Sequence, residues 1–243
     1  MNDRAAAVND DVRVARILQR GLAPDAVPDV SGLEVAARYS TGGIGEVGGD
    51  WYDVLCLRDD GVAIVIGDVA GHGINAAATM GQLRHGARAY LLDERSPAAV
   101  LGRLNQLIRW LLPADVATAA VASVAADRSV VTIASAGHPP IMWLGSRDGQ
   151  FLDMTGGPAL GLDAQAEYSD TAFDLAPGDG LLLYTDGLVE RRGETIDHGL
   201  ERLATEVQRP VDHKSLLDRL IESVPSAAGR DDLAVLAVFR SGV

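Results

Sequence analysis

Aspartates stand at the ends of the most apolar segments of this chain. Asp50 opens DWYDVLCL, Asp68 closes VAIVIGD, Asp186 closes GLLLYTD and Asp231 opens DDLAVLAVF. Each one alone is typical of a turn. In an antiparallel sheet, however, the start of one strand lies beside the end of its neighbour, so all four can meet at one edge. Clustered carboxylates repel one another unless they bind protons or cations, and carboxylate oxygens suit hard divalent ions. We therefore expect Mg²⁺ or Mn²⁺ at this edge.

The spacing of two of these segments predicts that Asp50 and Asp68 are neighbours. Only RDDG separates residues 50–57 from residues 62–68, which is too short for a parallel crossover and predicts an antiparallel hairpin. If residue 57 pairs with residue 62, then residue 51 pairs with residue 68, and the two carboxylates lie side by side. A slip of one residue would change this register.

The sequence after Asp68, VAGHG, suits a substrate site. Gly71 and Gly73 allow a tight bend, which would let the carbonyl of Val69 face a metal. The helix expected from residue 74 would point its partly positive N-terminus toward an anionic substrate. His72 would then donate a proton or a hydrogen bond, with a purely structural role as the alternative.

Several enzyme classes are disfavoured by the same reading. The motif GGIGEVGG contains G-x-G-x-x-G at Gly43, Gly45 and Gly48, but a strand follows it where a dinucleotide site needs a helix. A kinase glycine loop requires a lysine on the next strand, and the sole lysine, Lys214, lies far away. The chain has no G-x-S-x-G, Walker or H-E-x-x-H motif.

The composition of the chain restricts its possible partners and its cellular location. A formal net charge of −13 over 243 residues argues against a nucleic-acid partner. No apolar run reaches the roughly 18–20 residues of a membrane span, and the N-terminus is too charged for a secretory signal. The single cysteine, Cys56, excludes an internal disulfide and is expected to be buried and inert. We therefore expect a cytoplasmic protein that does not bind membranes.

Residues 1–28 are expected to form an N-terminal helix and linker, and residues 29–243 one domain. Apolar side chains recur at helical spacing up to Leu22, before two prolines end the pattern. This helix either packs on its own domain or serves as a linker or dimer helix. Strands are expected at 33–40, 50–57, 62–68, 117–126, 130–136, 140–144, 150–154, 170–175, 180–186 and 231–239, with helices at 74–92, 96–112, 199–208 and 213–224. Repeated hairpins and paired helices predict antiparallel sheets covered by helices.

Five motifs occur in an order that resembles a known family. VGGDWYDV, IGDVAGHG, SAGHPP, LLLYTDGLVE and GRDDLAVLAV are similar to the motifs of SpoIIE-type bacterial Ser/Thr phosphatases, a branch of the metal-dependent type 2C (PPM) protein phosphatases. The resemblance runs from about Leu18 to Phe239. It implies an α/β (α+β) fold, a four-layer α-β-β-α sandwich of two mainly antiparallel sheets flanked by helix pairs, which agrees with the reading of the elements.

The resemblance also implies a mechanism. A metal-bound water attacks the phosphorus of phosphoserine or phosphothreonine, while two Mn²⁺ or Mg²⁺ ions neutralise the phosphoryl oxygens. Asp68 matches the bridging aspartate, the Val69 carbonyl follows it, and Asp50 holds a metal directly or through water. The implied metal ligands are Asp50, Asp68, Val69, Asp186 and Asp231, and the implied catalytic residues are Asp68, Asp50 and His72.

The resemblance implies a substrate and partners as well. The substrate would be a phosphorylated anti-sigma-factor antagonist, a STAS-domain protein of partner-switching stress control. An upstream sensor domain or regulator and a homodimer through the N-terminal helix are further expectations. The alternatives are a catalytically silent binding module, disfavoured because all four aspartates are present, and another metal-dependent phosphohydrolase.

Other residues near the motifs are expected to be structural. Asp53 and Asp232 would be supporting acids, His138 would shape a turn, and Trp51 and Tyr52 would pack in the core. Arg38 is the single guess for a phosphate-binding residue.

Overall fold

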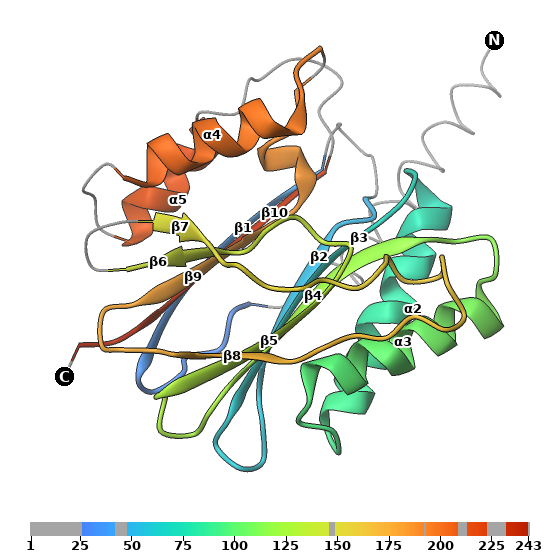
Figure 1. Ribbon diagram of the computed structural model, residues 1–243, viewed down its shortest axis with the longest axis horizontal. Helices are drawn as coiled ribbons and strands as arrows, with labels where there is room; N and C mark the ends of the chain where they lie inside the picture. Colours follow the sequence, from blue (N-terminus) through green and yellow to red (C-terminus); the bar gives the residue numbers. More distant parts are fainter. Residues whose placement is uncertain are drawn as a thin grey trace, which may run out of the picture.

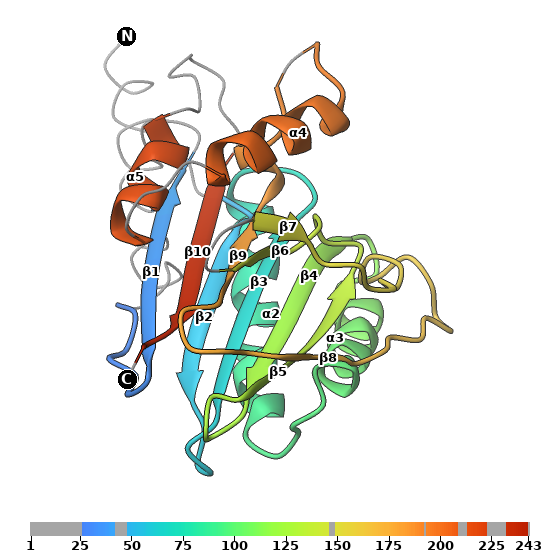
Figure 2. The ribbon, with the colours of Figure 1, turned by 60° about the vertical axis from the view of Figure 1, so that its left-hand side comes forward.

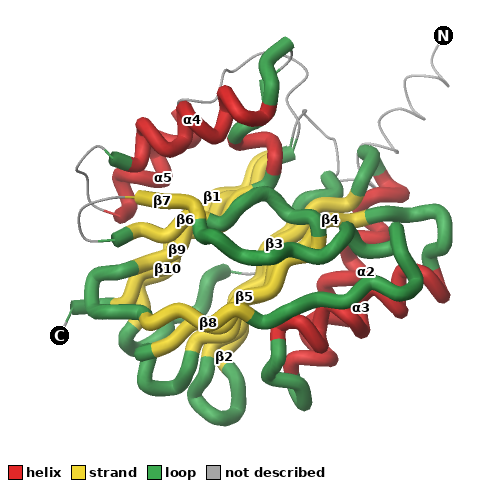
Figure 3. The backbone as a smooth tube through the Cα atoms, in the orientation of Figure 1, coloured by secondary structure: helices red, strands yellow, loops and turns green. Residues whose placement is uncertain are grey.

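Two antiparallel sheets pack face to face between two pairs of helices (Figure 1). The computed structural model describes residues 26–41, 48–145, 149–191, 193–208, 213–222 and 232–242. Figure 3 shows the helices on the two outer sides and the strands between them. The predicted α-β-β-α sandwich is confirmed.

Each sheet has five strands within the described residues. The first sheet has the order β1 (Leu33–Ser40), β10 (Leu233–Arg240), β9 (Gly180–Tyr184), β6 (Met142–Leu144) and β7 (Gly149–Phe151). The second has the order β2 (Trp51–Cys56), β3 (Val62–Val69), β4 (Ala117–Val124), β5 (Val130–Ala136) and β8 (Thr171–Asp174). All of these strand pairs are antiparallel, and Figure 2 shows β10 and β2 side by side where the two sheets face each other.

The helices cover the outer face of each sheet. Helices α2 (Ile74–Leu91) and α3 (Pro97–Leu111) cover the second sheet, and α4 (Ile196–Val207) and α5 (His213–Glu222) cover the first (Figure 1). A short 3₁₀ turn, η1 (Asp186–Leu188), follows β9. The predicted cap of α3 is confirmed, because the Ser96 hydroxyl accepts a hydrogen bond of 3.1 Å from the Ala99 amide.

Strand β3 has a continuously apolar sequence because both of its faces are buried. Val62, Ile64 and Ile66 face the first sheet, whereas Ala63 and Val65 face α2 and α3. A strand buried on both faces has no polar side, so the usual alternation disappears. Such a strand can carry a terminal carboxylate to a fixed place at the sheet edge.

Two expectations fall on residues outside the described ranges, and a third, that Cys56 is buried, is wrong. The N-terminal helix and Asp231 lie in residues 1–25 and 223–231, which the structure does not describe. Cys56 is exposed, not buried, because it ends β2, where the edge strand leaves the core. None of the described helices is long and apolar enough to cross a membrane.

Candidate active site

The carboxylates of Asp50 and Asp68 meet at one edge of the second sheet. Trp51 pairs with Gly67, and continuing this register by one residue sets Asp50 opposite Asp68. A hydrogen bond joins the two side chains. The predicted register was wrong by one residue, because Cys56 rather than Leu57 pairs with Val62. Asp50 and Asp68 are nevertheless neighbours, as predicted. The shift by one residue places them directly opposite each other, whereas the predicted register set them one residue apart along the strands.

The surroundings of Asp50 disfavour its negative charge. The residue is 2% exposed, and this burial is the main cause that raises the pKa of its carboxyl well above the usual value. The charges of Asp68 and, less strongly, Asp232 raise the pKa further. A hydrogen bond from Thr185 acts in the opposite direction. The site therefore favours a proton or a cation beside this carboxylate.

Thr185 connects this edge to the other sheet. Its hydroxyl donates a hydrogen bond of 2.6 Å to Oδ2 of Asp50 and accepts one of 2.9 Å from the amide of Ala234. The Thr185 amide in turn donates to the Ala234 carbonyl at 3.0 Å. Because Asp186 follows directly and opens η1, this network brings the end of β9 to the same edge. The sequence analysis did not identify Thr185 as a site residue. The available signal was its position, since it is a hydroxyl residue between an apolar strand and Asp186.

Two glycines allow the strands to approach closely here. The Gly49 amide donates a hydrogen bond of 3.0 Å to Oδ2 of Asp232. A Cβ on Gly49 would lie 2.5 Å from the Val69 carbonyl oxygen and 3.3 Å from Oδ1 of Asp68. A Cβ on Gly48 would overlap Oδ2 of Asp232. The Val69 carbonyl therefore lies at this edge, as expected, and Asp232 supports the backbone that precedes Asp50.

The donor set suits a hard divalent cation in its chemistry. Two carboxylates, buried Asp50 and partly exposed Asp68, lie together with a backbone carbonyl beside them. Over the described ranges no three acidic, histidine or cysteine side chains are grouped as a complete metal site. Asp231, one of the predicted ligands, lies outside these ranges. The described part thus provides the centre of the expected site, and its metal ligands stay a prediction.

His72 lies on an exposed loop beside this edge. Gly71 and Gly73 flank it with φ angles of 104° and 82°, values that favour glycine. The loop is tied to β4 by a hydrogen bond of 2.9 Å from the Ala70 amide to the Val116 carbonyl. Helix α2 begins after Gly73 without a side-chain cap. An exposed imidazole on such a loop is accessible to a substrate.

His138 is buried behind the edge. Its Nδ1 lies 3.1 Å from the hydroxyl of Thr118, which pairs with Asp68 across β3 and β4. Burial lowers the pKa of His138 to about 3, and the backbone of Tyr184 acts in the opposite direction. The ring is therefore neutral at pH 7. The expectation of a turn residue is supported by Gly137, whose φ is 63°, but burial adds a packing role.

The other expected residues lie in structural roles. Asp53 forms ion pairs with Arg84 and Arg88 of α2, which the sequence reading did not assign as its partners. Trp51 and Tyr52 are buried, as predicted. Arg38 pairs with Asp218 of α5 at 2.5 Å.

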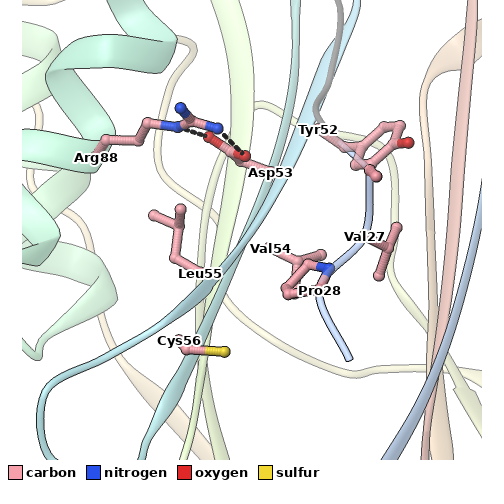
Figure 4. A pocket seen from close by; sticks show the side chains of 9 residues that line it. Val27, Pro28, Tyr52, Asp53, Val54, Leu55, Cys56 and Arg88 are labelled. Carbon is pink, nitrogen blue, oxygen red and sulfur yellow. Dashed lines mark hydrogen bonds and ion pairs between the residues drawn. The ribbon is translucent and has the colours of Figure 1, made fainter. Parts of the chain in front are cut away.

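A cavity of about 280 Å³ lies at the free edge of β2, between α2 and residues 26–28 (Figure 4). Arg88 closes one side of it through its hydrogen bonds to Asp53, and Cys56 lines the far end. Of the expected site residues, none lines this cavity. The candidate active site is therefore the open carboxylate edge and not this cavity.

Solved structures of other proteins share this fold. A solved structure of the SiaA-PP2C domain of Pseudomonas aeruginosa superposes with a TM-score of 0.79 at 24% identity and covers 100% of both chains, which shows the PP2C fold. The RsbU and RsbW domains of Rv1364c from Mycobacterium tuberculosis give a TM-score of 0.79 at 30% identity, over 90% of this chain and 63% of that one.

The family follows from the sequence comparison. The model of Stage II sporulation protein E (SpoIIE) matches residues 58–241, and the chain belongs to this family. Phosphoserine phosphatase RsbU of Bacillus subtilis is 28% identical over 189 residues, which cover 77% of this chain and 56% of RsbU. The chain spans about half the length of the curated relatives that it matches.

Proposed function

We propose that this protein is a metal-dependent protein Ser/Thr phosphatase that hydrolyses phosphoserine and phosphothreonine. The observation that carries the proposal is the pair formed by buried Asp50 and partly exposed Asp68, which meet at an open edge and share a hydrogen bond. Family membership and the similarity to a phosphoserine phosphatase support it.

Two Mn²⁺ or Mg²⁺ ions are proposed at this edge, held by Asp50, Asp68, the Val69 carbonyl, Asp186 and Asp231. When bound, such ions lower the pKa of a coordinated water and neutralise charge on phosphoryl oxygens. The raised pKa of Asp50 supports this assignment, because a nearby cation would offset the burial and the charge of Asp68 that favour its protonated form.

The chain's own groups have separate tasks in this scheme. Thr185 fixes the carboxylate of Asp50 by its hydrogen bond, and Gly49 lets the Val69 carbonyl approach. The uncapped N-terminus of α2 offers backbone N–H groups to phosphate oxygens. His72, exposed on the preceding loop, would donate a proton to the departing serine or threonine oxygen.

The proposed substrate is a phosphorylated anti-sigma-factor antagonist of the STAS type. The similarity to RsbU and to the RsbU–RsbW domain protein supports a place in partner switching. We also propose an upstream sensor or regulator. Residues 29–243 would form the catalytic domain, and residues 1–28 would form the contact of a homodimer.

The direct test is hydrolysis of para-nitrophenyl phosphate with Mn²⁺ and with a chelator. We expect activity only with the metal, and loss of at least about 100-fold in Asp68→Asn and Asp186→Asn, since each removes a charged ligand. Asp93→Asn, at an exposed position beyond the far end of α2, is the matched control and should retain activity. A folded wild-type chain without metal-dependent turnover would instead support the silent binding module.

A further inference from the structure

Three large apolar side chains are exposed at one corner of the molecule. Trp110 is 86% exposed, Leu111 65% and Leu162 61%. The first two end α3, and the third lies in the turn that follows Leu160. We refer to Trp110, Leu111 and Leu162 as the Trp110 patch. Helix α3 already buries Val100, Leu101, Leu104 and Ile108 against the second sheet, so these two exposed residues are not part of its packed face.

Hydrogen bonds hold the two parts of the Trp110 patch together. The side chain of Asn105 donates to the Asp163 carbonyl at 2.8 Å and accepts from the Gly161 amide at 2.8 Å. Arg109 donates to the Gly161 carbonyl at 3.2 Å. These bonds fix residues 161–163 against the last turns of α3, so that Leu162 is presented beside the helix end.

The same corner is attached to the acidic edge. Val116, five residues after Leu111, accepts the hydrogen bond from Ala70, two residues after Asp68. Leu160 and Ala117 exchange two hydrogen bonds of 3.1 and 2.8 Å at the start of β4. Five residues of fully extended chain span at most about 18 Å. The patch and the catalytic loop therefore belong to one hydrogen-bonded unit, a short distance apart.

We propose that the Trp110 patch is the surface on which the folded phosphoprotein substrate docks. The inference rests on the proposed phosphatase function. A partner domain of about 100 residues has a radius of gyration of about 13 Å, so it can cover the patch while its phosphorylated residue reaches Asp50 and Asp68. Tryptophan and arginine are the residue types that most often dominate binding at protein interfaces, and Arg109 adjoins Trp110 here.

Position favours this occupant, because the segment that follows Leu111 bonds the loop after Asp68 through the Ala70 amide and the Val116 carbonyl. The formal net charge of −13 gives an anionic phosphoprotein no long-range attraction to the chain. Affinity for the substrate must then come from short-range contacts beside the site, and the exposed apolar area of the Trp110 patch supplies them.

The first test compares two substrates of the full-length chain. Trp110→Ala and Leu162→Ala should lower kcat/KM about 10- to 30-fold for a serine-phosphorylated STAS-domain protein, mainly through KM, and leave para-nitrophenyl phosphate hydrolysis within twofold. Leu92→Ala is the matched control, since Leu92 is 54% exposed at the opposite end of α2. Equal losses on both substrates, or no loss on the phosphoprotein, would overturn the proposal.

The second test does not depend on turnover. Trp51 is buried and Trp143 half-buried, so acrylamide quenching of fluorescence reports mainly on Trp110, and Trp110→Phe identifies its share. In the Asp68→Asn chain, a tryptophan-free phosphorylated STAS protein should protect Trp110 from the quencher. No protection would overturn the docking surface, and protection that grows with enzyme concentration alone would assign the patch to self-association. Failure of the proposed function would appear separately, as a wild-type chain inactive on both substrates.

Discussion

The hydroxyl of Thr185 donates a 2.6 Å hydrogen bond to the carboxylate of Asp50, and this contact joins the two sheets at the acidic edge. Thr185 follows β9 of the first sheet, whereas Asp50 precedes β2 of the second. The relative position of the sheets therefore determines where this carboxylate lies. A site assembled across a sheet interface is sensitive to how the sandwich packs.

Removing this hydroxyl tests its role in orienting Asp50. Thr185→Val keeps the shape but loses the hydrogen bond, and we expect a free energy of unfolding lower by about 1–3 kcal/mol. The pKa of Asp50 should rise further, because the Thr185 hydrogen bond lowers it. The Mn²⁺ concentration for half-maximal hydrolysis of para-nitrophenyl phosphate should increase. Thr185→Ser should restore it, and a midpoint equal in both variants would contradict the role.

Asp50 should make the metal-free protein less stable as pH rises. Its folded-state pKa is raised, so its contribution to stability is full below its unfolded pKa and is lost as pH rises through the folded value. With a chelator present, Asp50→Asn should therefore raise Tm at pH 7–8 and flatten the fall of Tm with pH. Thermal melts between pH 5 and 8 measure this. A lower Tm for Asp50→Asn at pH 8 would contradict the sign.

Much of the fold could be predicted because hydrophobic period and loop length are local signals. The register predicted for the hairpin of β2 and β3 was wrong by one residue. In the structure Asp60 adopts a left-handed φ of 61°, and the Leu57 amide donates a hydrogen bond of 2.8 Å to the Gly61 carbonyl. The loop thus closes over three residues instead of four. Turn geometry of this kind depends on one backbone angle and is poorly signalled by RDDG.

The site was predictable only where strands carry it. The meeting of Asp50 and Asp68 followed from the hairpin, but Thr185 reaches Asp50 across 135 positions of sequence. No local pattern reports a contact between two sheets. Arg84 and Arg88, one helical turn apart on α2, were likewise missed as partners of Asp53 because helix packing decides which face they present.

Gly49 is expected to be intolerant of a side chain. Gly49→Ala would place a Cβ 2.5 Å from the Val69 carbonyl and should displace the backbone of the proposed metal site. We expect weaker Mn²⁺ activation and a loss of about 2 kcal/mol or more in stability. Gly102→Ala in α3 is the matched control, since nothing lies within 4 Å of its Cβ, and it should stabilise the protein by up to about 1 kcal/mol. Equal Mn²⁺ midpoints in the two variants would contradict the close approach.

His138 should contribute an acid-sensitive share of the stability. Burial lowers its folded pKa to about 3, so the contribution is complete above the unfolded pKa of about 6.5 and is lost as pH falls toward the folded value. Urea unfolding of the wild type should show a free energy that falls between pH 7 and pH 4. His138→Gln removes this titration and should flatten that fall, even if the variant is less stable at pH 7. His198→Gln, at an exposed position of α4, should retain the wild-type slope, and an unchanged slope in His138→Gln would show that another group titrates instead.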